Sequence, residues 1–157
     1  MDLIGNIALG DAKSRSADIL GHVFEYFLGE FALAEGKQGG QFYTPRSIVE
    51  LLVSMLEPYK GRVYDPCCGS GGMLIQSKQY IAETGGDPRD VALFGQELNG
   101  GTWSICKMNL ILHSVKSADI RQGDTIKEPL HIDRRGELRT FDVVIANPPY
   151  LFARNSE

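Results

Sequence analysis

The chain has 157 residues, of which 43% are hydrophobic and 23% charged, and its net charge is −4. These proportions are those of one ordinary globular domain, and they exclude a disordered chain, a collagen-like repeat and a disulfide-stabilised miniprotein. The sequence shows no basic patch of the kind expected in a protein that binds nucleic acid by itself. Because the sequence shows neither a secretory signal nor an apolar run of bilayer length, we expect a cytoplasmic protein without a membrane partner.

The first part of the chain, residues 1–40, is predicted to be a helical segment followed by a linker. Apolar residues recur at three- and four-residue spacings over residues 19–31, which is the pattern of an amphipathic helix. Ser16 is predicted to cap this helix and Gly36 to end it. A polar, glycine-rich run then separates the helix from residues 41–157.

The second part of the chain alternates between predicted helices and short strands. Thr44 is predicted as an N-cap and Pro45 as the first helical residue, because the missing N–H of proline has no cost there. Two more helices are predicted, from Gly72 to Ala82 and through residues 105–112. The predicted strands are residues 63–64, 91–95, 119–122 and 141–146, and the last is expected to be buried on both faces. This alternation predicts an α/β fold with a parallel sheet and right-handed crossovers.

A glycine-rich turn, DPCCGSGG, begins at Asp65 between a predicted strand and a predicted helix. Its glycines let the backbone approach a ligand closely, and the helix N-terminus offers free N–H groups. A dinucleotide-binding turn would have a third glycine where this chain has Leu74. The acidic residue followed by Gly69 and Gly71 instead suits S-adenosylmethionine, whose ammonium group Asp65 would meet directly or through water. A tight turn without a ligand is the alternative.

Two further acidic residues follow the next two strands. Glu97 has the position of the carboxylates that accept hydrogen bonds from both ribose hydroxyls in nucleotide-binding βαβ folds. Asp124 would be placed to accept from an adenine amine at the far end of the cofactor. The structural alternatives are an exposed acid at a strand end for Glu97 and an ordinary Gly-Asp turn for Asp124.

The run Asn147-Pro148-Pro149-Tyr150 follows the fourth predicted strand and is the most specific signal in the chain. Its two prolines cannot continue a central strand, and they hold the backbone extended. The Asn147 side chain and the Pro148 carbonyl would then present two oxygen acceptors at the carboxyl edge of the sheet. Such a pair can hold an exocyclic NH2 group and free its lone pair for attack on a methyl sulfonium, while Tyr150 stacks on an extruded base. A proline-stiffened loop is the alternative.

The cysteines and histidines receive no catalytic role. Pro66-Cys67 is similar to the Pro-Cys of enzymes that attack cytosine C5, but it lies in the glycine turn and not after the fourth strand. Cys67 and Cys68 are expected to be small packed side chains near the cofactor. Three histidines lack metal-ligand spacing, so no metal site is expected; they are His22, His113 and His131.

Together these residues resemble the methylation (M) subunit of type I restriction–modification systems, an adenine-N6 DNA methyltransferase family. The resemblance rests on residues 19–28, the run GQFYTP that ends at Pro45, the glycine turn and the run NPPY. It implies a Rossmann-like class I methyltransferase core over residues 41–157, incomplete at the C-terminus. This core would have a partial parallel sheet of about four strands, helices on both faces and an N-terminal helix before it. The resemblance also implies that Thr44 contacts the carboxylate of the cofactor.

The function that the resemblance implies is methylation of adenine N6 in DNA, with S-adenosylmethionine as the cofactor. The implied partners are DNA, a specificity subunit that recognises the sequence, a motor/nuclease restriction subunit and, in such an assembly, a second copy of the chain. We expect the isolated chain to be inactive, because only part of the family's sheet is readable in the sequence. The alternatives are a non-catalytic fragment that binds cofactor or partner, or a methyltransferase for protein glutamine or RNA guanine.

Overall fold

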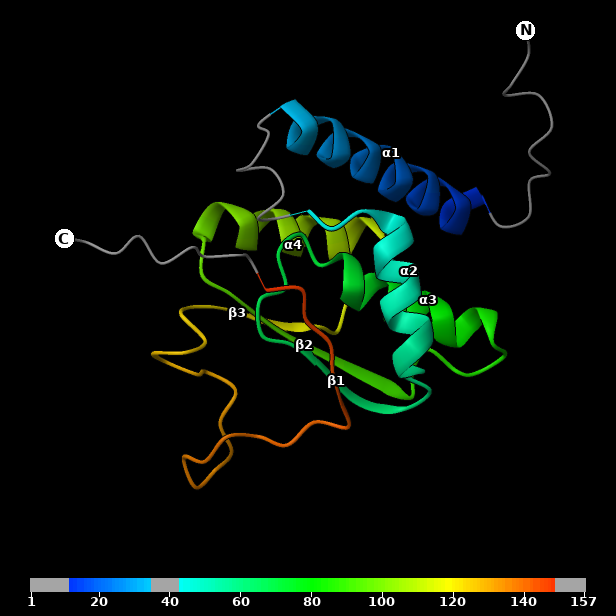
Figure 1. The fold of residues 1–157 in the computed structure, drawn as a ribbon. Helices are drawn as coiled ribbons and strands as arrows, with labels where there is room; N and C mark the ends of the chain where they lie inside the picture. Colours follow the sequence, from blue (N-terminus) through cyan, green and yellow to red (C-terminus); the bar gives the residue numbers. More distant parts are fainter. Residues whose placement is uncertain (1–11, 35–42, 149–157) are drawn as a thin grey trace, which may run out of the picture.

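The computed structural model describes residues 12–34 and 43–148, with side chains from residue 19 onward. These residues form a parallel sheet of four strands. Figure 1 shows the helices packed above the sheet. The strands are β1 (Gly61–Asp65), β2 (Val91–Glu97), β3 (Asp119–Gln122) and β4 (Val143–Val144). The helices are α1 (Ala12–Ala34), α2 (Arg46–Leu56), α3 (Gly72–Glu83) and α4 (Gly100–Leu112). The predicted α/β fold with a parallel sheet is confirmed.

The strand order β3-β2-β1-β4 creates a switch point between β1 and β4. The chain moves outward from β1 through α3, β2 and α4 to β3, and then returns to pair β4 with the other side of β1. Val63 lies opposite both Leu93 of β2 and Val143 of β4. Because all four strands are parallel, their carboxyl ends meet at one edge, and open α/β sheets bind ligands at such a switch point.

The hydrophobic core lies between the sheet and helices α2, α3 and α4. Val63 and Leu93 are buried and belong to one cluster with side chains from all three helices. The helical members of this cluster are Val49, Val53, Met73, Leu74, Ile75, Ile81, Cys106 and Leu110. The same packing holds the first turns of α3 and α4 against the carboxyl edge of the sheet, where the predicted site lies.

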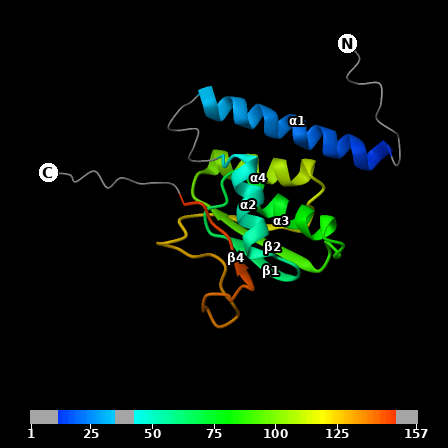
Figure 2. The ribbon, with the colours of Figure 1, turned by 45° about the vertical axis from the view of Figure 1, so that its right-hand side comes forward.

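The second face of the sheet is covered by the loop of residues 123–142, which Figure 2 shows on the opposite side from the helices. Phe141 of this loop stacks on Tyr64 of β1, with ring centroids 4.4 Å apart. His131 lies with its Nε2 2.9 Å from the carbonyl oxygen of Gly95 in β2. The helices that were expected on both faces are therefore found on one face of the described sheet.

The fourth strand is shorter and more exposed than the sequence predicts. The β-branched run 141–146 was expected to be a strand buried on both faces, but β4 comprises only two residues. Val144 is 55% exposed, whereas Ile145 is 2% exposed. The prediction of burial on both faces is wrong because β4 is the outermost strand on its side of the described sheet, and an edge strand has a neighbour on one side only.

Two predicted helix caps are also wrong. Helix α1 already includes Ala12, so Ser16 lies inside the helix and not at its start. Good helix formers before Ser16 explain the upstream extension. The N-cap of α2 is Pro45 itself, no side chain caps that helix, and the helix begins at Arg46. Thr44 therefore lies one residue before the cap, and its hydroxyl contacts a distant residue instead.

Helix α1 lies across α4 on the side away from the sheet, as Figures 1 and 2 show. Leu28 and Ala32 are buried, and Gly21 packs so closely on His113 that a Cβ there would lie 2.7 Å from Nε2. Several apolar side chains on the same helix are exposed; they include Ile19, Leu20, Val23, Phe27 and Phe31. The predicted helix end at Gly36 and the boundary at residue 40 lie outside the described residues. None of the described helices is long and apolar enough to cross a membrane.

Candidate active site

The carboxyl end of β1 holds a buried acid. Asp65 is 2% exposed, and its Oδ1 accepts a hydrogen bond from the backbone N–H of Cys67 at 3.0 Å. Burial raises the pKa of Asp65 from 3.8 to about 7; the Cys67 N–H opposes this rise and the charge of Glu97 adds to it. A cation beside this carboxylate would favour its ionised form. The site is therefore suited to a positively charged ligand group.

The turn after Asp65 depends on glycines. Gly69 and Gly71 have φ angles of +54° and +84°, a region that residues with a side chain rarely adopt. A Cβ on Gly71 would also lie 2.8 Å from the Sγ of Cys106. Gly71 is the N-cap of α3 and no side chain caps that helix. The first N–H groups of α3 thus have no competing side-chain acceptor, which is the arrangement of an anion or dipole site.

Glu97 connects the end of β2 to the same turn. Its Oε2 accepts from the N–H of Gly69 at 3.0 Å, and its Oε1 accepts from the N–H of Asn99 at 2.9 Å. Each carboxylate oxygen has two lone pairs, so one acceptor position on each remains for a ligand hydroxyl. Glu97 thus lies beside the glycine turn, and it also holds that turn in place, a role that the sequence pattern did not reveal.

Asp124 follows β3 and organises its own loop. Its Oδ1 accepts from the N–H groups of Ile126 and Lys127 at 3.0 and 3.1 Å. The hydrogen bond from Lys127 is the main cause of the lowered pKa of Asp124. The neighbouring Gly123 donates its N–H to the carbonyl oxygen of Glu97 at 3.0 Å, which keeps this loop at the same edge. The ordinary turn therefore accounts for Oδ1 of Asp124, and Oδ2 lies 3.8 Å from the exposed ammonium group of Lys127.

Asn147 lies at the same edge, three residues beyond β4. Its exposed side chain donates a hydrogen bond from Nδ2 to the Oγ1 of Thr44 at 3.2 Å. Burial and then the charge of Asp65 raise the pKa of Cys67 to about 12, and a hydrogen bond from the backbone N–H of Asn147 lowers it in part. Pro148 is exposed beside Asn147, and Tyr150 lies outside the described residues.

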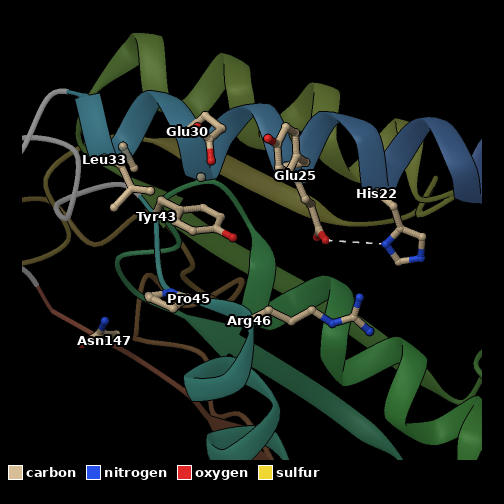
Figure 3. A pocket seen from close by; sticks show the side chains of 11 residues that line it. His22, Glu25, Glu30, Leu33, Tyr43, Pro45, Arg46 and Asn147 are labelled. Carbon is tan, nitrogen blue, oxygen red and sulfur yellow. Dashed lines mark ion pairs between the residues drawn. The ribbon is translucent and has the colours of Figure 1, made fainter.

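A cavity of about 840 Å³ opens beside Asn147, and Figure 3 shows its labelled walls. Helix α1 contributes Glu25 and Glu30 to one wall, and the segment before α2 contributes Tyr43 and Pro45 to another. A Cβ at Gly29 of α1 would lie 3.6 Å from the Tyr43 ring, an ordinary contact distance, so the ring lies directly beside this helix. The cavity is large enough for a planar group that approaches Asn147.

Glu25 joins two histidines beside this cavity. Its Oε1 lies 3.3 Å from Nε2 of His113. Its Oε2 lies 3.9 Å from Nδ1 of His22, the pair that Figure 3 marks with a dashed line. Burial alone would raise the pKa of Glu25, but both histidines and Arg46 bring that pKa below its ordinary value. Sequence patterns do not predict this cluster, because His113 follows α4 and is far along the chain from His22 and Glu25 of α1. Among the described residues no group of acidic, histidine and cysteine side chains has the arrangement of a metal site.

The cysteines are packed close to the turn. Cys68 and Cys106 are buried with their Sγ atoms 3.9 Å apart, and Cys67 is partly buried. Most predicted site residues lie at one edge of the sheet, around the carboxyl ends of the strands. Those that the structure brings there are Thr44, Asp65, Gly69, Gly71, Glu97, Asp124, Asn147 and Pro148.

The family model for N-6 DNA methylases matches residues 15–156 of this chain. The chain belongs to that family. It is 46% identical over 134 residues to the HindI methylase subunit of a type I restriction enzyme from Haemophilus influenzae, a match that covers 85% of this chain and 29% of that subunit. It is 39% identical over 138 residues to the MjaIX methylase subunit from Methanocaldococcus jannaschii, covering 88% of this chain and 24% of that subunit.

A solved methyltransferase subunit of a type I restriction–modification system from Streptococcus thermophilus has a similar fold. Its TM-score is 0.72 at 31% identity, and the match covers 96% of this chain and 30% of that one. An O-methyltransferase from Streptomyces achromogenes, solved with S-adenosylmethionine, has a TM-score of 0.55 at 16% identity over 90% of this chain and 55% of that one, which shows the fold alone. The resemblance to type I M subunits and the class I methyltransferase fold are therefore confirmed. This N-6 DNA methylase chain spans 29% and 24% of the length of the two curated relatives.

Proposed function

We propose that this chain is the cofactor-binding and methyl-transfer part of a DNA adenine-N6 methyltransferase, the modification subunit of a type I restriction–modification complex. The observation that carries this proposal is the position of Asn147, at the switch-point edge beside the turn formed by Asp65 and its glycines. Membership of the N-6 DNA methylase family supports DNA as the substrate in preference to protein glutamine or RNA guanine.

The residues at the carboxyl edge fit S-adenosylmethionine as the cofactor. The buried carboxylate of Asp65 is suited to its positive charge, and the two remaining acceptor positions of Glu97 match two ribose hydroxyls. Gly69 and Gly71 leave the turn without side chains that would obstruct the ligand, and Oδ2 of Asp124 would accept from an adenine amine. When bound, S-adenosylmethionine supplies an electrophilic methyl group.

The chain's own part in the reaction is to hold the target amine. Asn147 Oδ1 and the Pro148 carbonyl would accept the two hydrogens of an exocyclic NH2 group, and Tyr150 would stack on the base. Acceptors of this kind orient the nitrogen lone pair and stabilise the positive charge that develops on the amine. The cavity beside Asn147 gives a planar base a route to these acceptors.

The partners that we propose are DNA, a specificity subunit, a restriction subunit and a second copy of this chain, all in the cytoplasm. A net charge of −4 suits a subunit of an assembly in which other chains supply most of the DNA-binding affinity. A structure of a type I restriction–modification system that is described in terms of complex assembly supports this, with a TM-score of 0.73 at 26% identity over 89% of this chain and 29% of that one.

A second candidate is a fragment that binds cofactor or a partner without turnover. The exposed Val144 on β4, the outermost described strand on that side of the sheet, favours this alternative. Titration of the chain with S-adenosylmethionine by calorimetry, followed by methyl-transfer assays on DNA, RNA and a release factor, distinguishes the candidates. Transfer to DNA adenine supports the main proposal, and binding without turnover supports the fragment. The absence of binding would contradict both the cofactor site and the methyl-transfer proposal.

A further inference from the structure

The Asn147 side chain has two chemically different ends, and only one of them can hold an amine. Oδ1 accepts hydrogen bonds, whereas Nδ2 only donates. An exposed asparagine can rotate its amide and present Nδ2 to the substrate, where two NH2 groups would face each other without an acceptor. Because Asn147 is exposed, burial does not fix the orientation of its amide.

A single side-chain contact selects the orientation. Asn147 Nδ2 donates to Oγ1 of Thr44 at 3.2 Å, although the two residues are 103 positions apart. This hydrogen bond occupies the donor end and leaves Oδ1 for another donor. A hydroxyl that donates its hydrogen to another group, such as the cofactor carboxylate, can only accept from Asn147, so a rotated amide would place Oδ1 against an oxygen with no hydrogen to donate.

We propose that Thr44 is a positioning residue for methyl transfer, which holds the Asn147 amide with Oδ1 directed to the target amine. This inference rests on the function proposed above for Asn147. The residue acts through Asn147 and need not touch the target base. The contact to the carboxylate of the cofactor that the family resemblance implies is compatible with it, because a hydroxyl that accepts from Asn147 can still donate its own hydrogen.

Both ends of this hydrogen bond are held by separate parts of the fold. Thr44 precedes Pro45, which restricts its backbone to extended conformations, and α2 is anchored directly afterwards through the buried Val49. On the other side, Ile145 donates its N–H to the carbonyl oxygen of Tyr64 at 2.9 Å, two residues before Asn147. Two independently anchored segments therefore meet at one hydrogen bond, which is suited to fixing a side-chain orientation.

Among residues 19–34 and 43–148, the Thr44 hydroxyl has no hydrogen bond other than the one from Asn147. No side chain caps α2, so the N-cap role that the sequence predicts is not used. Replacement by valine keeps the shape of the side chain and removes the hydroxyl, and replacement by serine keeps the hydroxyl and removes the methyl group. The pair Thr44→Val and Thr44→Ser therefore separates hydrogen bonding from packing.

The test compares these two variants with wild type in the assembled methyltransferase, with kcat for DNA methylation and the Kd for S-adenosylmethionine measured separately. We expect Thr44→Val to lower kcat about 10- to 100-fold, since a misplaced catalytic group costs about this much. Thr44→Ser should stay within about threefold of wild type. Thr84→Val is the control. It removes a hydroxyl at the C-cap of α3, the end of that helix away from the glycine turn, and should leave kcat unchanged.

Two further measurements exclude a merely structural role. The Asn147→Ala/Thr44→Val double variant should be no slower than Asn147→Ala alone, because Thr44 acts only through that amide. The side-chain NH2 signals of Asn147 in a ¹⁵N spectrum of the full chain should move in Thr44→Val and stay close to wild type in Thr44→Ser.

Three results would overturn the inference: an unchanged kcat in Thr44→Val, a loss limited to cofactor affinity, or equal losses in the valine and serine variants. Failure of the proposed function has a different signature, because the wild-type assembly itself would then transfer no methyl group to DNA, and this inference would fail with it.

Discussion

The two halves of the site are built in different ways. At the end of β1, Asp65 is buried, and Glu97 accepts backbone N–H groups from both the glycine turn and the start of α4. At the end of β4, Asn147 is exposed and depends on one side-chain contact with Thr44. The proposed cofactor half is therefore organised by backbone hydrogen bonds, whereas the proposed amine-holding half depends on a contact between distant segments. Substitutions should be able to disable either half separately.

The largest expected effect is that of Asn147→Ala in the assembled methyltransferase. Removal of one preorganised polar group from a transition state typically costs about 10²- to 10³-fold in kcat. Since the exposed side chain of Asn147 bonds to Thr44 and not to the glycine turn, the Kd for S-adenosylmethionine should change less than about threefold. Single-turnover kinetics and calorimetry on the same preparation would measure both. Wild-type turnover in this variant would refute the role of Asn147.

Substitution of Asp65 should give the opposite pattern. Asp65→Asn removes the charge but keeps an oxygen that can accept from Cys67, so the fold should remain while cofactor affinity falls about 10- to 100-fold. In wild type, affinity should also fall as the pH drops below about 7, because Asp65 then becomes protonated. Calorimetric titrations at pH 6 and pH 8 test both points. An equal pH dependence in Asp65→Asn would show that another group is responsible.

The same raised pKa has a consequence for stability. Between its ordinary value of 3.8 and about 7, Asp65 is protonated in the folded chain but ionised in the unfolded chain. The folded state then binds more protons, so the free energy of unfolding should fall as the pH rises through this window. Asp65→Asn should remove this contribution, which urea denaturation at several pH values would measure. If the free energy of unfolding depended on pH in the same way in wild type and in Asp65→Asn, that result would contradict the raised pKa of Asp65.

The glycine turn should be sensitive to a single methyl group. Gly71→Ala combines a positive φ with a Cβ 2.8 Å from Cys106 Sγ, and we expect it to lower the free energy of unfolding by about 2–4 kcal/mol. Gly85→Ala is the matched control, because Gly85 has a φ of +82° and no atom within 4 Å of its Cβ position. It should cost about 1–2 kcal/mol. Equal losses in the two variants would mean that the close contact with Cys106 has no effect.

The smallest effect is expected at the edge strand. Val144→Thr on β4 should change the free energy of unfolding by less than about 0.5 kcal/mol, because this side chain is largely exposed. Val63→Thr on the neighbouring β1 should cost about 1–3 kcal/mol, since it places a hydroxyl in the core. Thermal unfolding of both variants makes the comparison. A large loss in Val144→Thr would show that β4 is covered in solution.

Most of the fold could be predicted from the sequence because its signals are local. The predicted third strand matches β3, and the helix predicted from Gly72 matches α3 to within one residue at its end. Errors arose where tertiary contacts override local preferences. Thr44 resembles an N-cap in the sequence, but its hydroxyl accepts from Asn147, and the β-branched run 141–146 has too few neighbours to be buried on both faces.

The sequence by itself determined the parallel α/β fold, the glycine turn after Asp65 and the acceptor motif at Asn147, because each of these depends on residues adjacent in the chain. Only the tertiary structure decided that Glu97 holds the Gly69 backbone, that burial raises the pKa of Asp65, and that Thr44 accepts a hydrogen bond from Asn147. These features depend on the approach of groups from distant segments and on the water that they exclude. Local sequence patterns specify neither of these.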